Sequence, residues 1–166
     1  MRSLLYNYLH HFDRKARVGP ASSKLRDWLE SLALPALVHE LMSTSWPQRP
    51  GSLGAFYIKS STELAKDQDL PRLLDHGLLK IGSGPNGDLL VLDLKTEDLV
   101  PGVVEHGKFW GQEPEDDDPR AFHEPIARTF ASLFFRVDEE RYVPCDYWAA
   151  VDFNAFMSEE DAGRDS

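Results

Sequence analysis

The sequence predicts an α+β protein with a largely antiparallel sheet, arranged as a meander, and helices packed on it. Apolar residues recur at helical spacing in residues 1–45 and again in residues 126–137. Between these regions lie short apolar runs of strand length. After Gly77 the connections are too short for the crossover helix that parallel strands need, so we expect neighbouring strands to pair antiparallel.

Three helices are expected in the N-terminal region. The apolar face of the first consists of Leu5, Leu9 and Phe12. Ser22 or Ser23 is expected to cap the second helix. Its apolar stripe consists of Leu25, Trp28, Leu29 and Leu32. Leu34-Pro35 then begins a third helix, because proline suits a first helical turn.

The middle of the chain predicts short elements separated by turns. A loop at residues 46–51 precedes a strand at residues 56–58, where aromatic and branched side chains are adjacent. A short helix is expected around residues 64–74, ending near Gly77. Residues 100–106 supply a later strand, with Pro101 near its beginning, where no ladder hydrogen bond is lost.

The stretch GSGPNG, residues 82–87, has the glycine spacing of a dinucleotide-binding loop. Such a loop opens a helix, whereas an apolar strand at residues 88–94 follows here and another apolar run, residues 78–81, precedes it. A kinase phosphate loop does lie between strands, but the chain has no H-R-D or D-F-G motif and only 166 residues. We therefore predict a hairpin in which Asn86-Gly87 tolerates positive φ and Asp88 hydrogen-bonds the turn backbone. Its structural residues are Gly82, Gly84, Asn86, Gly87 and Asp88.

The C-terminal third begins with an acidic loop, EPEDDDP, at residues 113–119. A helix with Pro125 in its first turn is expected to follow. Its stripe consists of Ile126, Phe130, Leu133, Phe134 and Val137. Residues 142–153 predict an edge strand or a packed tail, and the polar residues 157–166 are expected to fray. These elements predict a single domain over residues 1–156 with a core at about 22–153.

Composition bears on partners and location. The 28 Asp and Glu residues outnumber the 18 Lys and Arg residues, so the net charge of −10 disfavours nucleic acid and anionic membrane surfaces. No apolar stretch reaches the length that crosses a bilayer, no export signal is evident, and the lone Cys145 cannot form an internal disulfide. We expect a cytoplasmic protein, and the acidity reflects either simple solubility or a basic protein partner.

Catalytic and metal-binding motifs are not apparent. The six histidines are scattered, and no H-E-x-x-H or cysteine cluster accompanies them. Asp116-Asp117-Asp118 lacks the alternating ligands and the glycine of a calcium loop. Gly51-Ser52-Leu53-Gly54 does not have the spacing of a nucleophile elbow. We predict no enzyme activity, no metal site and no cofactor.

Residues 79–93, LKIGSGPNGDLLVLD, resemble the core signature of the SUKH superfamily, which includes the Smi and Knr cell-wall regulators of yeast. In that signature a strand ending in Ile-Gly leads through a turn to Gly-Asp and an apolar strand carrying Asp. Leu34-Pro35 and the stretch ASLFF at residues 131–135 are similar to the family's leucine-proline start and closing helix. The usual Gly-Gly after the second helix is replaced by residues 43–46, STSW. The resemblance covers about residues 22–137 and leaves open whether the N-terminal helix is an addition to the core.

The resemblance implies an α+β fold and, for many bacterial members, an immunity protein that binds and neutralises a polymorphic toxin, often a nuclease. A nuclease presents a basic cleft, so an acidic inhibitor fits this class of partner. The residues expected to contact it are Glu113, Glu115, Asp116, Asp117 and Asp118. The alternative is a non-catalytic scaffold or regulatory protein-interaction module without a toxin partner, and the sequence leaves the oligomeric state open.

Overall fold

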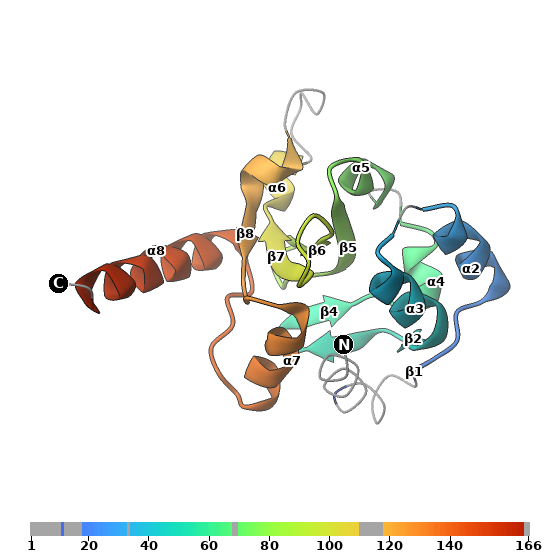
Figure 1. Ribbon diagram of the computed structural model, residues 1–166, viewed down its shortest axis with the longest axis horizontal. Coiled ribbons are helices and arrows are strands. Elements are labelled where there is room, and N and C mark those ends of the chain that lie inside the picture. The colour runs from blue at the N-terminus through green and yellow to red at the C-terminus, as the bar shows by residue number, and fades with distance from the viewer. Residues whose placement is uncertain (1–10, 12–17, 33, 68–69, 110–117, 165–166) are drawn as a thin grey trace.

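The computed structural model describes residues 11, 18–32, 34–67, 70–109 and 118–164 (Figure 1). They form the predicted α+β fold with an antiparallel sheet, which has six strands, and a separate two-stranded sheet that was not predicted. The strands of the larger sheet are β3 (Gly51–Leu53), β4 (Phe56–Ile58), β5 (Leu78–Ser83), β6 (Leu89–Asp93), β7 (Val100–Val104) and β8 (His123–Pro125). Their spatial order is their order in the chain, which confirms the meander. The predicted first helix lies outside the described residues, which include only His11 from this region.

The hairpin of β5 and β6 forms the centre of the sheet and is buried on both faces. Its register pairs Leu79 with Leu92, and a bulge lies between Lys80 and Gly82. One face joins the main core, and the other packs in a second apolar cluster beneath α5 (Leu70–Asp75). The second cluster consists of Leu73, Leu78, Leu89, Val91 and Val104. Burial on both faces explains why the two strands are continuous apolar runs rather than alternating ones.

Two helices cover one end of the main core (Figure 1). The predicted second helix is α2 (Ser23–Glu30), in which the side chain of Ser22 accepts a hydrogen bond from the backbone N–H of Leu25. The predicted third helix is α3 (Ala36–Thr44), with Pro35 at the N-cap rather than inside the first turn. The expected loop after α3 contains β2 (Trp46–Pro47), which pairs with β1 (Val18–Gly19), and the buried indole of Trp46 donates to the Lys59 carbonyl.

The single helix predicted at residues 64–74 is wrong, because two short helices occupy this region. The first, α4 (Ser61–Leu64), begins at a capping box between Ser60 and Glu63, three residues before the predicted start. The carboxylate of Asp67, in the connection between α4 and α5, pairs with Lys59 at 2.8 Å and with Lys80 at 3.2 Å. These ion pairs hold the connection against the sheet. The predicted end near Gly77 is confirmed, since α5 ends at Asp75 and Gly77 has a φ of +76°.

The strand β8 was not predicted, and because of it the late helix begins further along the chain than expected. Pro125 pairs with Gly102 at the end of β8, so the prediction that Pro125 lies in a first helical turn is wrong. The helix, α7 (Phe130–Asp138), begins later because Thr129 and Ser132 form a capping box there. Its Phe130, Leu133 and Phe134 are buried, as the stripe predicted. Two short elements precede β8, namely α6 (His106–Phe109) and the 3-10 helix η1 (Pro119–Phe122).

The C-terminal region is a helix, α8 (Tyr147–Arg164), and not the edge strand predicted for residues 142–153. The tail from residue 157, which we expected to fray, is helical as far as Arg164. The carboxylate of Asp146 accepts from the N–H of Ala149 at 2.8 Å and caps the first turn. The first turns of α8 pack on β7 and β8, and the helix then projects from the body at the end opposite α2 (Figure 1). Within the described ranges, every helix is too short or too polar to cross a membrane.

Candidate functional site

Two glycines of the predicted turn allow close approach of two other segments. A Cβ on Gly82 would overlap the carbonyl oxygen of Tyr57 in β4, and one on Gly84 would overlap the carbonyl oxygen of Cys145, just before α8. Gly87 has a φ of +97°, whereas Asn86 does not have positive φ. The turn therefore uses Gly87 alone in the conformation that we expected from the Asn86-Gly87 pair, and its other glycines provide space for packing.

Asp88 joins this turn to two distant elements. Its carboxylate accepts hydrogen bonds from the Asn86 amide at 3.0 Å, the His106 backbone at 3.0 Å, the His106 Nδ1 at 2.8 Å and the Tyr147 backbone at 2.8 Å. The residue is 1% exposed. Burial raises the pKa of Asp88, but the hydrogen bonds from Tyr147, His106 and Asn86 outweigh it and hold the pKa below its ordinary value. The ionised carboxylate thus anchors the first residue of α8, a role wider than the turn backbone contact that we expected.

The acidic residues predicted to contact a partner are placed only in part. Glu113, Glu115, Asp116 and Asp117 lie outside the described residues. Asp118 is described, and its carboxylate accepts from the backbone N–H of Arg120 at the start of η1 and lies 2.9 Å from the Nδ1 of His76. With its side chain 55% exposed, Asp118 remains accessible to a partner.

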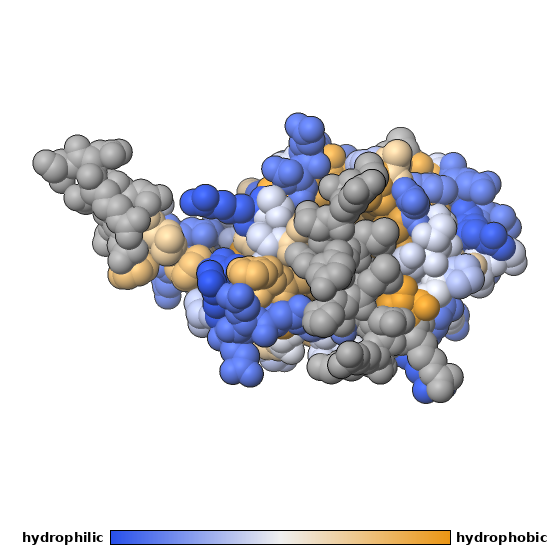
Figure 2. Space-filling view, turned by 60° about the horizontal axis from the view of Figure 1, so that its bottom comes forward, coloured by the Kyte–Doolittle hydropathy of each residue, from blue (hydrophilic) through white to orange (hydrophobic). Residues whose placement is uncertain are grey.

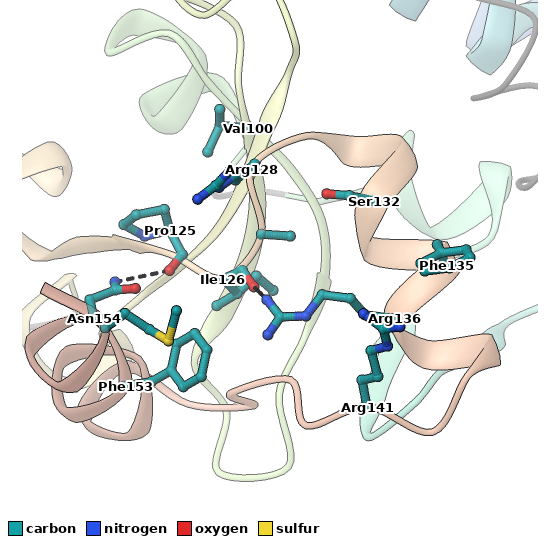
Figure 3. A pocket seen from close by; sticks show the side chains of 12 residues that line it. Val100, Pro125, Ile126, Arg128, Ser132, Phe135, Arg136, Arg141, Phe153 and Asn154 are labelled. Carbon is teal, nitrogen blue, oxygen red and sulfur yellow. Dashed lines mark hydrogen bonds between the residues drawn. The ribbon is translucent and has the colours of Figure 1, made fainter. Parts of the chain in front are cut away.

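A groove with a volume of about 600 Å³ lies between α7 and α8, where β8 ends (Figure 3). Pro125 and Ile126 form its floor, α7 contributes Phe135 and Arg136, and α8 contributes Phe153, Asn154 and Met157. The amide of Asn154 donates to the Pro125 carbonyl at 3.1 Å and to the Glu124 carboxylate at 3.0 Å, which fixes α8 against the sheet edge. The volume is within the range of pockets that bind ligands or anchor side chains.

Large apolar side chains are exposed around this groove. Phe135 is 46% exposed, Phe156 is 57% exposed and Met157 is 37% exposed. Tyr142, also exposed, contacts the ring of Phe153 with the ring centroids 5.7 Å apart. Figure 2 shows apolar side chains gathered at the base of the projecting helix and bordered by hydrophilic ones. We call this surface, made of Phe135, Tyr142, Phe153, Phe156 and Met157, the α7–α8 face.

Three arginines line the groove, and each has different contacts. Arg136 donates to the Ile126 carbonyl at 3.2 Å, and its guanidinium lies 5.2 Å from the centre of the Phe153 ring. Arg141 pairs with Glu139 at 2.8 Å and lies over Phe135. Arg128 is exposed, and no hydrogen bond or ion pair joins it to another residue of the described part of the chain. In Figure 3, Arg128 lies above Arg136, and Arg141 lies below it.

A second polar cluster lies at the other end of β6. Arg120 binds Asp93 with contacts of 2.5 and 3.1 Å and donates to the His76 carbonyl. His123 is close to this pair, and its buried Nε2 has no hydrogen-bond partner among the described residues. Burial lowers the pKa of His123, Asp93 and Glu124 raise it, and Arg120 lowers it further, with a net decrease. The cluster therefore holds a neutral histidine beside a charged pair.

Among the described residues, no set of three His, Cys, Asp or Glu side chains lies close enough to hold a metal ion. The α7–α8 groove combines a cavity with exposed apolar side chains, and the sequence analysis did not identify it. Its signals were spread over residues 125–157, and the predicted edge strand at residues 142–153 would have separated them.

Comparison with known proteins does not extend this description. No protein-family model, curated protein or solved structure matches the chain. The SUKH assignment therefore stays a prediction that rests on residues 79–93 and on the order of the elements.

Proposed function

We propose that this chain is a cytoplasmic immunity protein of the SUKH type that neutralises a cognate toxin by direct binding. The observation that carries the proposal is the α7–α8 face, where Phe135 and Met157 line a groove and remain exposed, with the exposed Phe156 next to Met157 in α8. Aromatic side chains and methionine are enriched at protein interfaces, and buried aromatic anchors contribute much of the binding energy there. A contiguous apolar patch on a protein surface is typical of a protein-binding site.

The net charge of −10 supports a basic partner such as a nuclease domain. Charge acts over a Debye length of about 8 Å or more and raises the rate of encounter, whereas apolar anchors slow dissociation. In this proposal Glu113, Glu115, Asp116, Asp117 and Asp118 guide the partner, and the α7–α8 face holds it.

The test is co-expression with each toxin domain encoded beside the gene. We expect the wild-type chain to restore growth and to form a complex with the toxin that elutes as one species in size-exclusion chromatography. Replacing Phe156 by Ser is expected to weaken the complex by about tenfold or more. Absence of rescue and of complex formation with every neighbouring toxin would overturn the immunity function and favour the alternative, a scaffold or regulatory module without a toxin.

A further inference from the structure

The groove between α7 and α8 is lined by positively charged side chains, whereas the protein as a whole is acidic. The chain as a whole carries a net charge of −10, yet the described side chains that line the groove include Arg128, Arg136 and Arg141 and no carboxylate. Glu139, which pairs with Arg141, and Glu124, which accepts from Asn154, are the carboxylates bound to lining residues. The groove is thus a local positive site on an acidic protein, and it favours an anionic group.

The three arginines differ in what they can offer to a ligand. Arg136 is committed to the Ile126 carbonyl and the Phe153 ring, so it shapes the floor. Arg141 shares its charge with Glu139. Arg128 forms no hydrogen bond or ion pair with another described residue, so its planar guanidinium can bind an incoming carboxylate through two parallel hydrogen bonds.

The walls of the groove select for an apolar neighbour of that anion. Phe153 and Met157 of α8 line the groove together with Phe135 of α7 and with Ile126. Phe156, next to Met157 in α8, is also exposed, and a ligand that covers both residues is longer than a free small carboxylate. An extended or helical protein segment has the required length and combination of side chains.

We propose that the α7–α8 groove binds a segment of a protein partner in which an Asp or Glu adjoins a large apolar residue. The carboxylate pairs with Arg128, and the apolar side chain enters between Phe153 and Met157. This inference rests on the proposed protein-binding role of the α7–α8 face and specifies the chemistry of the segment that it accepts. It implies that a partner that is basic overall presents a local acidic and apolar segment to this groove.

The test selects ligands without assuming a partner. A library of random 12-residue peptides displayed on phage is panned on the purified full chain, and the most enriched sequence is synthesised with a fluorescent label. We expect enriched peptides to place Asp or Glu beside Phe, Leu, Ile or Met. Fluorescence anisotropy is expected to show binding weakened at least about tenfold by Arg128→Glu and reduced by added salt. The matched control Arg26→Glu changes an exposed arginine on α2, at the opposite end of the molecule, and is expected to alter affinity less than about twofold.

Each other outcome overturns the inference in a distinguishable way. If enriched peptides lack carboxylates, or if Phe156→Ser weakens them and Arg128→Glu does not, the groove is an apolar site, and the proposed protein-binding function stands. If binding is insensitive to both variants, or if no peptide is enriched, the inference falls, and the co-expression assay with neighbouring toxins decides the proposed function independently. Circular dichroism of the Arg128→Glu variant, expected to match the wild type, shows that loss of binding is not loss of folding.

Discussion

The carboxylate of Asp88 accepts a hydrogen bond from the backbone N–H of Tyr147 at 2.8 Å, although 59 residues separate them. The two oxygens of this carboxylate thereby connect the β5–β6 turn with the start of α6, through His106, and with the first residue of α8. Because α8 forms one wall of the groove, Asp88 positions the candidate site without belonging to it.

Replacing Asp88 by Asn should lower the free energy of unfolding by about 2 kcal/mol or more, because the amide group points a donor at donors already present and hydrogen bonds to a charged acceptor are lost. Urea denaturation measures this change. The control Asp27→Asn, on the exposed surface of α2, should change stability by less than about 0.5 kcal/mol. Equal effects of the two variants would contradict the role assigned to Asp88.

Replacing Gly84 by Ala should destabilise the protein by about 1–3 kcal/mol, because the added methyl group overlaps the Cys145 carbonyl and must displace the segment before α8. Thermal denaturation followed by circular dichroism is a suitable measurement. Gly107→Ala is the matched control, since the nearest atom to its added methyl group is the Glu105 Oε1 at 3.8 Å. We expect that variant to retain wild-type stability.

Replacing Gly87 by Val should also destabilise the hairpin, by about 1–3 kcal/mol, because a branched residue resists a φ of +97°. Gly87→Asn should cost less, since Asn tolerates positive φ better than other non-glycine residues. The two variants are compared by urea denaturation. A Val variant as stable as the wild type would argue against this turn conformation.

The stability should fall as the pH decreases through two separate windows. His123 has a pKa below its ordinary value of 6.5, so its neutral form stabilises the fold above pH 6.5 and this contribution is lost as the pH falls toward the folded pKa. Asp88 has a pKa below 3.8, so its contribution is present above that value and is lost at lower pH. Urea titrations from pH 8 to pH 3 measure both, and His123→Gln should flatten the first window only. A wild-type profile that is flat below pH 6.5 would refute the buried neutral histidine.

Reversing the charge of the acidic loop should slow association with a basic toxin by about tenfold or more at low salt, while dissociation changes less. The reversed residues are Glu113, Glu115, Asp116, Asp117 and Asp118, each replaced by Lys. A control with the same change of net charge reverses exposed carboxylates elsewhere, namely Asp27, Glu30, Glu40, Glu97 and Asp98. Stopped-flow or surface plasmon resonance measures the rates. If both variants slow association equally, net charge alone is responsible and the loop is not part of the approach path.

The central elements were predictable because their signals are local. The stripes of α2 and α7 and the apolar runs of β5 and β6 each specify their own buried faces. The hairpin turn was predictable for the same reason, since Gly87 is adjacent to the strands that it connects.

The remaining elements depend on contacts between distant residues. The strand β8 has only three residues. The ring of His123 fits against Gly102 of β7 because glycine has no Cβ, and a Cβ at that position would overlap the ring. The aromatic residues at the start of α8 fit a strand by propensity, but Asp146 and the distant Asp88 stabilise a helical first turn instead. The groove combines residues from β8, α7 and α8, so none of those segments alone indicated it.

The order of strands in the large sheet has a consequence for how the protein folds. Each strand pairs with the next one along the chain, so the sheet can grow by successive hairpins with short loop closures, a topology associated with rapid folding. Docking of α8 on Asp88 requires a much longer closure, and we expect it to complete the native state last. The groove would then form late in folding, and the exposed aromatic residues of α7 and α8 would come together only after the sheet beneath them has formed.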